Sequence, residues 1–243
     1  MSTWSIASLN PVQRKIVEHK TGPALVIAGA GSGKTRVITH RVAQLIHSGI
    51  PASSILLLTF TNKAANEMAQ RVGRALKNST EQQKIIHGTF HSVGSRFLRR
   101  NAKLLNYYNN FSILDSSDSR DLIKASLAET VGKPDKYFPK AAVLQNMFSL
   151  AFNRFCTQKM ILDQPYHERS FHLEQLISAD YPNFEENTET ILNILAAYRH
   201  KKKRGQVMDF DDLLENWLEL LLRHGEGLPL CRQIQYILVD EYQ

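Results

Sequence analysis

The chain is poor in cysteine and contains no long apolar stretch. Only two of its 243 residues are cysteines, Cys156 and Cys231. Two cysteines cannot complete a structural zinc site or build a disulfide framework, so they predict buried thiols in a reducing compartment. The longest apolar runs, residues 24–31 and 55–60, fall far short of the roughly 20 residues that a membrane-spanning helix needs. Residues 1–20 also lack the continuous apolar block of a secretory signal. These absences predict a cytoplasmic protein that does not interact with membranes.

What the chain does contain is the composition of an ordinary folded protein. Hydrophobic residues make up 43% of it and charged residues 22%, which excludes intrinsic disorder and provides enough apolar surface for a core. Lysine and arginine number 30 against 23 aspartates and glutamates, leaving a net charge of +7. An excess of this sign favours a polyanionic partner without identifying one.

Short apolar runs alternate with helical patterns at both ends of the chain. Continuous apolar runs bounded by turn residues are typical of buried parallel strands, and helical spacing of apolar residues follows two of them. The predicted strands are residues 24–29, 55–60, 84–89 and 236–240, and the helices that alternate with them are residues 34–48 and 63–77. Strand alternating with helix predicts an α/β fold, a parallel sheet flanked by helices.

The middle of the chain has a different pattern. From about Ser92 to Tyr236 no further run of this strand type occurs, and residues 141–155 and 190–198 place apolar groups at helical spacing. We therefore expect an α/β domain interrupted by a mostly helical insertion. The expected division is residues 1–95 for the first α/β segment, 96–204 for the helical insertion and 205–243 for the return to the α/β domain.

A glycine-rich segment between the first predicted strand and helix matches the phosphate-loop pattern. Glycines let successive backbone N–H groups point into one concavity at a helix N-terminus, where phosphate groups bind. Lys34 would reach the β and γ phosphates, and the Thr35 hydroxyl would contact Mg²⁺. A simple glycine-rich turn is the structural alternative. The predicted phosphate-binding residues are Ala28, Gly29, Ala30, Gly31, Ser32, Gly33, Lys34 and Thr35.

An acidic pair, Asp240 and Glu241, ends the last predicted strand. Next to a phosphate loop, Asp240 would hold Mg²⁺ and Glu241 would accept a proton from the water that attacks the γ phosphate. Taken alone, such a pair is typical of a solvated strand end. Together with the phosphate loop it favours a hydrolase that uses water over a small-molecule kinase.

Two further strand ends carry aromatic and small polar residues. A ring can stack on a nucleic-acid base, while hydroxyl, amide and ammonium groups contact phosphates. The alternative places Phe60 in the core and makes Asn62 a helix cap. Because two such ends lie on one sheet edge, we expect a groove for single-stranded DNA. Its predicted residues are Phe60, Thr61, Asn62 and Lys63 after one strand, and Thr89, Phe90 and His91 after the next.

Several charged groups have less specific interpretations. The basic run at residues 199–204 and the cluster that follows the second strand end are solvated helix faces or supporting DNA contacts. Residues 209–212 predict a helix start, with Asp209 as the N-cap, and receive no catalytic role. The cluster consists of Arg96, Arg99, Arg100 and Lys103.

Six blocks in this order resemble the UvrD/Rep/PcrA group of superfamily 1 DNA helicases. They are residues 9–13, 28–36, 59–65, 88–92, 208–214 and 240–243. The resemblance implies a RecA-like phosphate-loop NTPase that uses ATP and Mg²⁺ to move 3′ to 5′ on single-stranded DNA and to open duplexes at single-strand/double-strand junctions. It also implies that Gln13 holds the adenine edge and that Arg36 lies against the base, although Gln13 alone would be interpreted as a helix-surface residue. Repair or replication proteins are further expected partners.

Members of this group continue well beyond a block equivalent to residues 240–243, through a second motor domain that supplies arginines to the ATP site. The resemblance therefore predicts that the chain is the N-terminal part of a helicase, which binds ATP–Mg²⁺ and single-stranded DNA weakly and does not unwind duplex by itself. In this ATPase class a strand from later in the sequence lies between the phosphate-loop strand and the acidic strand, so a gap is expected there. The alternatives are the helicase subunit of a recombination nuclease and a non-catalytic fragment that binds nucleotide or single-stranded DNA.

Overall fold

The computed structural model describes residues 6–76 and 84–242. The chain forms two compact units, which are considered separately: an α/β unit of Met1–Val93 and Glu226–Gln243, and a helical unit of Gly94–Gly225. In the part of the chain that is described, no helix combines the length and the apolar character that crossing a membrane requires.

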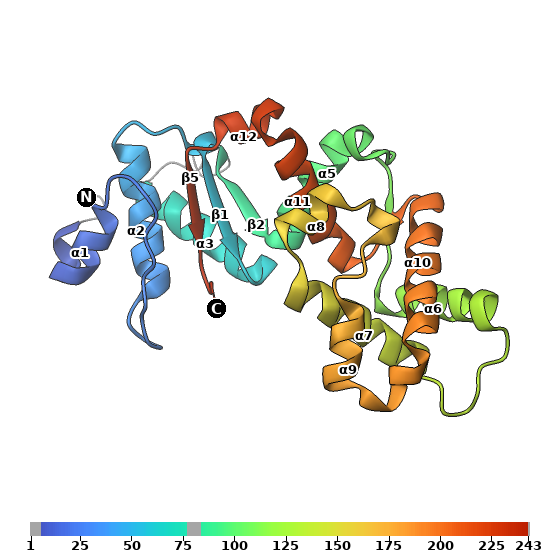
Figure 1. Cartoon of the computed structure of the whole chain (residues 1–243). Coiled ribbons are helices and arrows are strands. Elements are labelled where there is room, and N and C mark those ends of the chain that lie inside the picture. Colours follow the sequence, from blue (N-terminus) through green and yellow to red (C-terminus); the bar gives the residue numbers. More distant parts are fainter. Residues whose placement is uncertain (1–5, 77–83, 243) are drawn as a thin grey trace. The chain divides into compact units, whose positions relative to one another are not determined.

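Three parallel strands form the sheet of the α/β unit, in the order β2-β1-β5 (Figure 1). They are β1 (Ile55–Thr59), β2 (Ile86–Thr89) and β5 (Tyr236–Val239). All five residues of the central strand β1 are buried, as its continuous apolar sequence requires. The strands expected at residues 55–60, 84–89 and 236–240 are therefore confirmed.

Helices of the α/β unit share a core with this sheet. Val42 on α2 and Met68 and Val72 on α3 are buried in one hydrophobic cluster with Ile55 and Leu57 of β1. The amphipathic helices expected at residues 34–48 and 63–77 are confirmed within the described range. The helical elements are η1 (Ile6–Ser8), α1 (Pro11–Val17), α2 (Lys34–His47), η2 (Ala52–Ser54), α3 (Asn62–Leu76), the start of α5 (Phe90–Asn101) and, after η6 (Gly225–Gly227), α12 (Pro229–Gln233).

The strand expected at residues 24–29 is wrong. This segment has no regular secondary structure and runs as an open loop between α1 and α2 (Figure 1). Leu25 is 74% exposed and Ile27 92%. A strand needs a hydrogen-bonded neighbour, but β1 already has β2 on one side and β5 on the other. The apolar run pairs with neither outer strand of the sheet, in keeping with the gap that the sequence predicted between it and the acidic strand.

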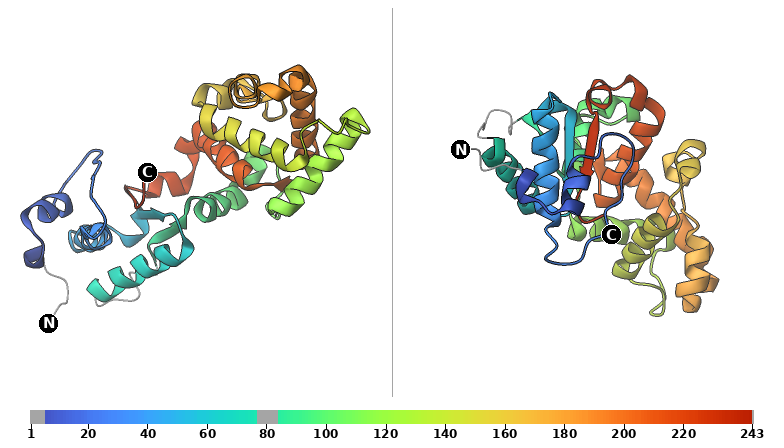
Figure 2. Two further views of the ribbon diagram at one scale, coloured as in Figure 1. Left: turned by 90° about the horizontal axis from the view of Figure 1, so that it is seen from below. Right: turned by 90° about the vertical axis from the view of Figure 1, so that its left-hand side faces the viewer.

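The helical unit consists mainly of α-helices (Figure 2), and their apolar side chains form one hydrophobic core. Leu144 and Met147 on α7, Leu176 on α9, and Ile191 and Ile194 on α10 are fully buried in it. The helices expected at residues 141–155 and 190–198 are confirmed. Its elements are the rest of α5, η3 (Ala102–Leu105), α6 (Ser116–Val131), α7 (Ala141–Phe155), α8 (Gln158–Asp163), η4 (Tyr166–Glu168), α9 (Leu173–Asp180), η5 (Pro182–Asn187), α10 (Thr188–Arg204) and α11 (Phe210–His224).

Two features of this unit differ from the expectations. First, β3 (Ser112–Ile113) and β4 (Val207–Met208) form a parallel pair, which is too short to leave a periodic signal in the sequence. Second, residues 205–225 belong to the helical unit, whereas the sequence predicted a return to the α/β domain from residue 205. The reason is α11, because Leu214, Leu218 and Leu222 pack against the helical core.

Candidate functional site

The phosphate-loop residues curl immediately before α2. Gly31 and Gly33 have φ angles of +74° and +89°, in the left-handed region that glycine adopts without strain. The Ser32 hydroxyl donates to the Gly29 carbonyl at 2.7 Å, which tightens the curl. A Cβ atom added to Gly29 or Gly31 would meet nothing within 4 Å. The loop thus forms an open backbone cradle at the positive end of the α2 dipole, the arrangement that binds phosphate groups.

Residues from the beginning of the chain hold this loop from outside. The Gln13 side-chain amide donates from Nε2 to the Ser32 carbonyl at 3.0 Å, while its Oε1 accepts from the Asn10 backbone N–H at 3.2 Å. Arg36 donates from Nη2 to the Ser8 carbonyl and hydroxyl at 3.1 and 2.9 Å. Gln13 and Arg36, which the resemblance assigns to the nucleotide base, therefore lie at the loop and connect it to residues 8–13.

The acidic pair lies close to the lysine of the phosphate loop. Lys34 Nζ is 3.8 Å from Glu241 Oε1, with the two side chains 35% and 40% exposed, so this is a loose ion pair. Asp240 is only 7% exposed, and its backbone N–H donates to the Leu58 carbonyl at 2.9 Å. Burial, and then the neighbouring charge of Glu241, raise the pKa of the Asp240 carboxyl group. The structure brings Lys34, Asp240 and Glu241 together at the end of β5.

The residues present fit a Mg²⁺–nucleotide complex. Thr35 offers a hydroxyl and Asp240 a carboxylate, which are the hard oxygen donors that Mg²⁺ prefers. No cluster of three or more histidine, cysteine or acidic side chains that could hold a metal exists among the described residues. A divalent cation would also offset the repulsion that raises the pKa of Asp240.

The two aromatic strand ends lie side by side. Thr59 of β1 and Thr89 of β2 are register partners, so Phe60 and Phe90 follow at equivalent positions on adjacent strands. Phe60 is 81% exposed and Phe90 39%. The alternative that placed Phe60 in the core is therefore wrong, and both rings are accessible to a ligand at the sheet edge where the acidic pair also lies.

Threonine side chains form hydrogen bonds where the chain passes from β1 into α3 and from β2 into α5. The Thr61 hydroxyl accepts from the Ala64 backbone N–H at 3.1 Å, so Thr61 caps α3, and the exposed Asn62 is not the cap. Thr89 and Ser92 form a reciprocal pair at the start of α5, at 2.9 and 3.1 Å. Ser92 belongs to the block of residues 88–92 that resembles the helicase family, but it was not among the predicted DNA-binding residues. The other candidates of this edge remain available for contact, because Asn62 and Lys63 are exposed and His91 is half-buried.

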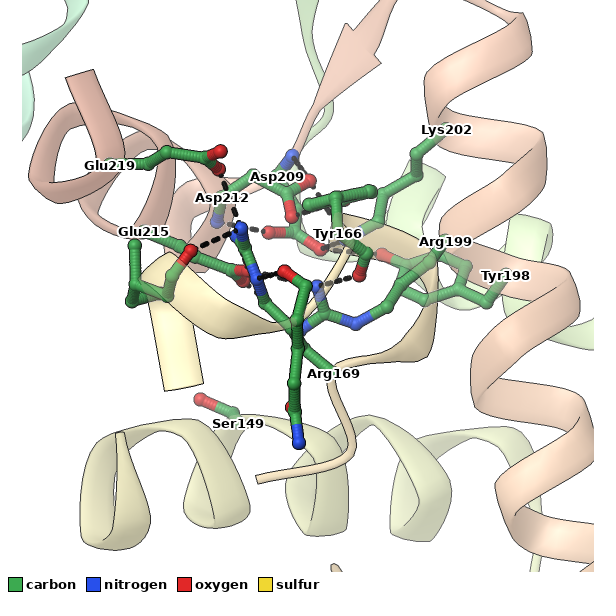
Figure 3. Close-up of polar contacts among 12 residues, drawn as sticks. Ser149, Tyr166, Arg169, Tyr198, Arg199, Lys202, Asp209, Asp212, Glu215 and Glu219 are labelled. Carbon is green, nitrogen blue, oxygen red and sulfur yellow. Dashed lines mark hydrogen bonds and ion pairs between the residues drawn. The ribbon is translucent and has the colours of Figure 1, made fainter. Parts of the chain in front are cut away.

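Part of the basic run at residues 199–204 is neither a solvated helix face nor a DNA contact. Arg199 and Lys202 are buried, at 5% and 3% exposure. Arg199 contacts Glu215 within α11, and Lys202 contacts Asp209 at the N-cap of that helix (Figure 3). Their spacing continues the buried face of Ile191, Leu195 and Tyr198. That helical periodicity was the sequence signal that could have identified them.

We call this group the buried charge network. Arg169 Nη1 and Arg199 Nη2 contact the two oxygens of Glu215 at 2.9 and 3.0 Å. Lys202 Nζ lies 2.6 Å from Asp209 and 2.8 Å from Asp212. These interactions connect α10 with α11 (Figure 3). The network consists of Arg169, Arg199, Lys202, Asp209, Asp212, Glu215 and Glu219.

The pKa values of the two aspartates of the network, Asp209 and Asp212, are shifted in opposite directions. Burial and the charge of Asp209 raise the pKa of Asp212 to about 6. Burial also disfavours the Asp209 carboxylate, but the ammonium group of Lys202 overrides it and lowers the pKa of Asp209 to about 2. Asp209 caps α11 and forms a capping box with Asp212, which confirms the helix start predicted at residues 209–212.

The basic cluster that follows β2 also contains both a residue with structural contacts and residues that are exposed. The Arg99 guanidinium donates to the carbonyls of Asn109 and Phe111 at 3.2 and 3.0 Å and lies 4.4 Å from the Phe111 ring centre. Arg99 therefore stabilises a turn, while Arg100 and Lys103 are exposed.

Comparison with known proteins gives a consistent result. The sequence profile of the UvrD/REP helicase N-terminal domain matches residues 9–243. The chain is similar to the ATP-dependent DNA helicase PcrA of Bacillus subtilis, with 36% identity over all of this chain and 30% of the relative. PcrA of Leuconostoc citreum is 34% identical over 97% of this chain and 29% of the relative. PcrA of Staphylococcus aureus is 35% identical over 97% and 30%. The chain thus spans about 30% of the length of these relatives.

Proposed function

Because the chain belongs to the UvrD/REP helicase family, we propose that it is the part of a DNA helicase that binds ATP–Mg²⁺ and single-stranded DNA. The complete motor hydrolyses ATP, moves 3′ to 5′ along single-stranded DNA and opens duplexes at single-strand/double-strand junctions. The observation that carries the proposal is the contact of Lys34 with Glu241 beside the buried Asp240, because it joins a phosphate-binding loop to a general base.

The proposed roles at the ATP site follow from this geometry. The loop backbone of residues 28–33 and the first turn of α2 hold the phosphate chain, and Lys34 neutralises charge on its β and γ groups. Thr35 and Asp240 hold the Mg²⁺ ion, which supplies charge neutralisation when bound. Glu241 Oε accepts a proton from the attacking water. Gln13 and Arg36, which lie next to the loop, contact the nucleotide base.

The proposed DNA site is the exposed edge that follows β1 and β2. Phe60 and Phe90 stack on bases, while Thr61, Asn62 and Lys63 contact the backbone. Thr89 and His91 extend this surface along the second strand end. Phe60 directly follows β1, and Asp240 directly follows β5, the strand that pairs with β1, so a change at the ATP site has a short path to the DNA site.

The rest of the proposal concerns the complete protein. Residues 1–95 and the final segment of the chain form the first motor domain, and the helical unit is its inserted subdomain. A second motor domain supplies the arginines that complete the ATP site. The full protein acts in the cytoplasm together with repair or replication proteins.

The proposal is tested with partial duplexes that carry a single-stranded tail at either the 3′ or the 5′ end. The full-length protein should separate the 3′-tailed duplex in the presence of ATP–Mg²⁺ and leave the 5′-tailed one intact. The 243-residue chain should bind the tail and separate neither. Strand separation that prefers the 5′ tail, or that needs no ATP, would contradict the proposal.

A further inference from the structure

The helical unit contains a cavity that the proposed helicase function does not use. Its volume is about 610 Å³, within the range of small-molecule sites in proteins. The end of α10 contributes His200, Lys203 and Arg204 to its wall, and α11 contributes Asn216, Glu219 and Arg223. We call it the basic cavity. All of its lining residues belong to the helical unit.

The charges in the wall of the basic cavity favour an anion. Its one carboxylate, that of Glu219, is already paired with Arg169 Nη2 and with Arg223 Nε, each at 2.9 Å. Within the described part of the chain neither Lys203 nor Arg204 forms a close ion pair, although the carboxylates of Glu219 and Asp212 attract Lys203 from a greater distance. Lys203 and Arg204 therefore face the cavity without a direct ion pair, and ammonium and guanidinium groups bind phosphate or carboxylate oxygens.

Lys203 is held in a position where an anion would stabilise it. Its ammonium group donates to the Leu105 carbonyl at 2.5 Å and lies 3.5 Å from the centre of the Tyr107 ring. Burial lowers its pKa to about 8, against the opposing attraction of Glu219 and Asp212 and together with repulsion from Arg169. A bound anion would restore the interaction energy that this ammonium group loses through burial.

Asn216 provides an independent sign of a ligand. It is 2% exposed and lines the cavity, and its side-chain Nδ2 makes no hydrogen bond of regular geometry among the described residues, although the Tyr107 hydroxyl interacts with its side chain. A buried amide donor without a partner costs roughly 1–3 kcal/mol, so such groups are rare unless a ligand or water satisfies them. Leu104, Leu105 and Tyr166 add apolar surface to the same wall.

We propose that the basic cavity binds a phosphate-bearing ligand of about mononucleotide size, with Lys203 and Arg204 contacting the phosphate and the polar side chain of Asn216 in the adjoining wall. The volume accommodates one nucleotide, and the apolar wall suits the face of a base or sugar. The same chemistry is offered by a free nucleotide and by the terminal nucleotide of a DNA strand.

The test uses the 243-residue chain with Lys34→Ala as background, so that binding at the phosphate loop is suppressed. Deoxycytidine 5′-monophosphate and a 5′-phosphorylated oligodeoxynucleotide of eight residues are titrated separately, and dissociation constants are measured by saturation-transfer NMR. Arg204→Gln should weaken binding about tenfold, since it removes one charge-assisted contact. Asn216→Leu, which keeps the side-chain volume, should also weaken it. Thermal unfolding verifies that each variant is folded.

Lys133→Gln is the matched control, because Lys133 is exposed, lies outside the cavity wall and changes the net charge by the same amount. Binding of the mononucleotide alone would identify a free nucleotide as the ligand. Tighter binding of the phosphorylated oligonucleotide than of its unphosphorylated form, lost in Arg204→Gln, would identify a strand end. The proposal is overturned if neither probe binds, or if Arg204→Gln and Lys133→Gln have equal effects.

Discussion

Charged side chains are held in opposite ways in the two units of this protein. In the α/β unit, Lys34 and Glu241 are 3.8 Å apart and are 35% and 40% exposed. In the helical unit, Arg169 and Glu215 are 2.9 Å apart, and each is 1% exposed. A loosely held charge can still bind a ligand, whereas a buried charge with saturated contacts mainly specifies the fold. The difference distinguishes candidate functional residues from structural ones.

The buried charge network has a cost that limits its role. Removing ions from water is expensive, so a buried ion pair often stabilises a fold no more than a well-packed apolar pair would. The network instead specifies which faces of α10 and α11 meet, because a displaced helix would leave a buried charge without a partner. It therefore defines the packing of the same two helices that line the basic cavity.

The largest expected effect concerns the loosely held pair. Lys34→Ala in the full-length protein should lower ATP turnover by about three orders of magnitude, since it removes the cation that stabilises charge on the transferred phosphoryl group. Binding of single-stranded DNA should stay within about twofold. Steady-state phosphate release measures the first quantity and a fluorescence titration the second. Lys20→Ala, at an exposed lysine of the same unit, is the control, and unchanged turnover in Lys34→Ala would remove the assignment.

A substitution in the buried charge network should lower the free energy of unfolding. Glu215→Gln keeps the shape of the side chain but leaves Arg169 and Arg199 facing a neutral group. Loss of a charge from a buried pair should lower the free energy of unfolding by about 3 kcal/mol. Urea denaturation measures it, with Glu186→Gln at an exposed position as the control. Equal effects of the two substitutions would show that burial does not distinguish these charges.

The exposed rings provide a comparison between the two units. Phe60→Ala should weaken binding of single-stranded DNA by roughly 1–3 kcal/mol if the ring stacks on a base, and Phe90→Ala should act in the same range. Tyr137→Ala should change binding little, although Tyr137 is 76% exposed in the helical unit. A fluorescence titration with a labelled oligonucleotide compares the three. Similar losses for Phe60 and Tyr137 would mean that exposed rings contribute irrespective of the sheet edge.

The smallest expected effect is a pH dependence. The pKa of Asp212 is about 6 in the folded state, above its ordinary value of about 3.9. The folded protein therefore binds more protons between pH 7 and 5, and this group should add about 1 kcal/mol of stability as the pH falls over that range. Asp212→Asn should remove this contribution, which the difference between urea titrations of the two proteins at both pH values measures. Identical pH slopes for the two proteins would contradict it.

Local patterns predicted the elements whose structure is decided locally. Helices 34–48 and 141–155, strand 55–60 and the Asp209 cap depend on periodicity and capping residues within a few positions, and they were found. Residues 24–29 have the sequence of a strand, but a strand also needs an adjacent strand to pair with, and no local pattern contains that long-range pairing.

The charged residues show the same limit. Arg199 and Lys202 belong to a run that is typical of a solvated surface, and their partners Glu215 and Asp209 come from another helix. Only the tertiary structure shows that these charges meet. The exposures of Phe60 and Phe90, and the contact of Lys34 with Glu241 across most of the chain length, likewise required the sheet to be assembled.

The unpaired edge of β5 has a consequence for the behaviour of this chain in solution. In the described structure β5 pairs with β1 alone, Ile237 is 62% exposed, and an apolar segment that includes Ile27 lies outside the sheet. An open strand edge is a template for pairing with another chain. A preparation of the isolated chain should therefore self-associate as its concentration rises, and a charged residue in place of Ile237 should reduce that association.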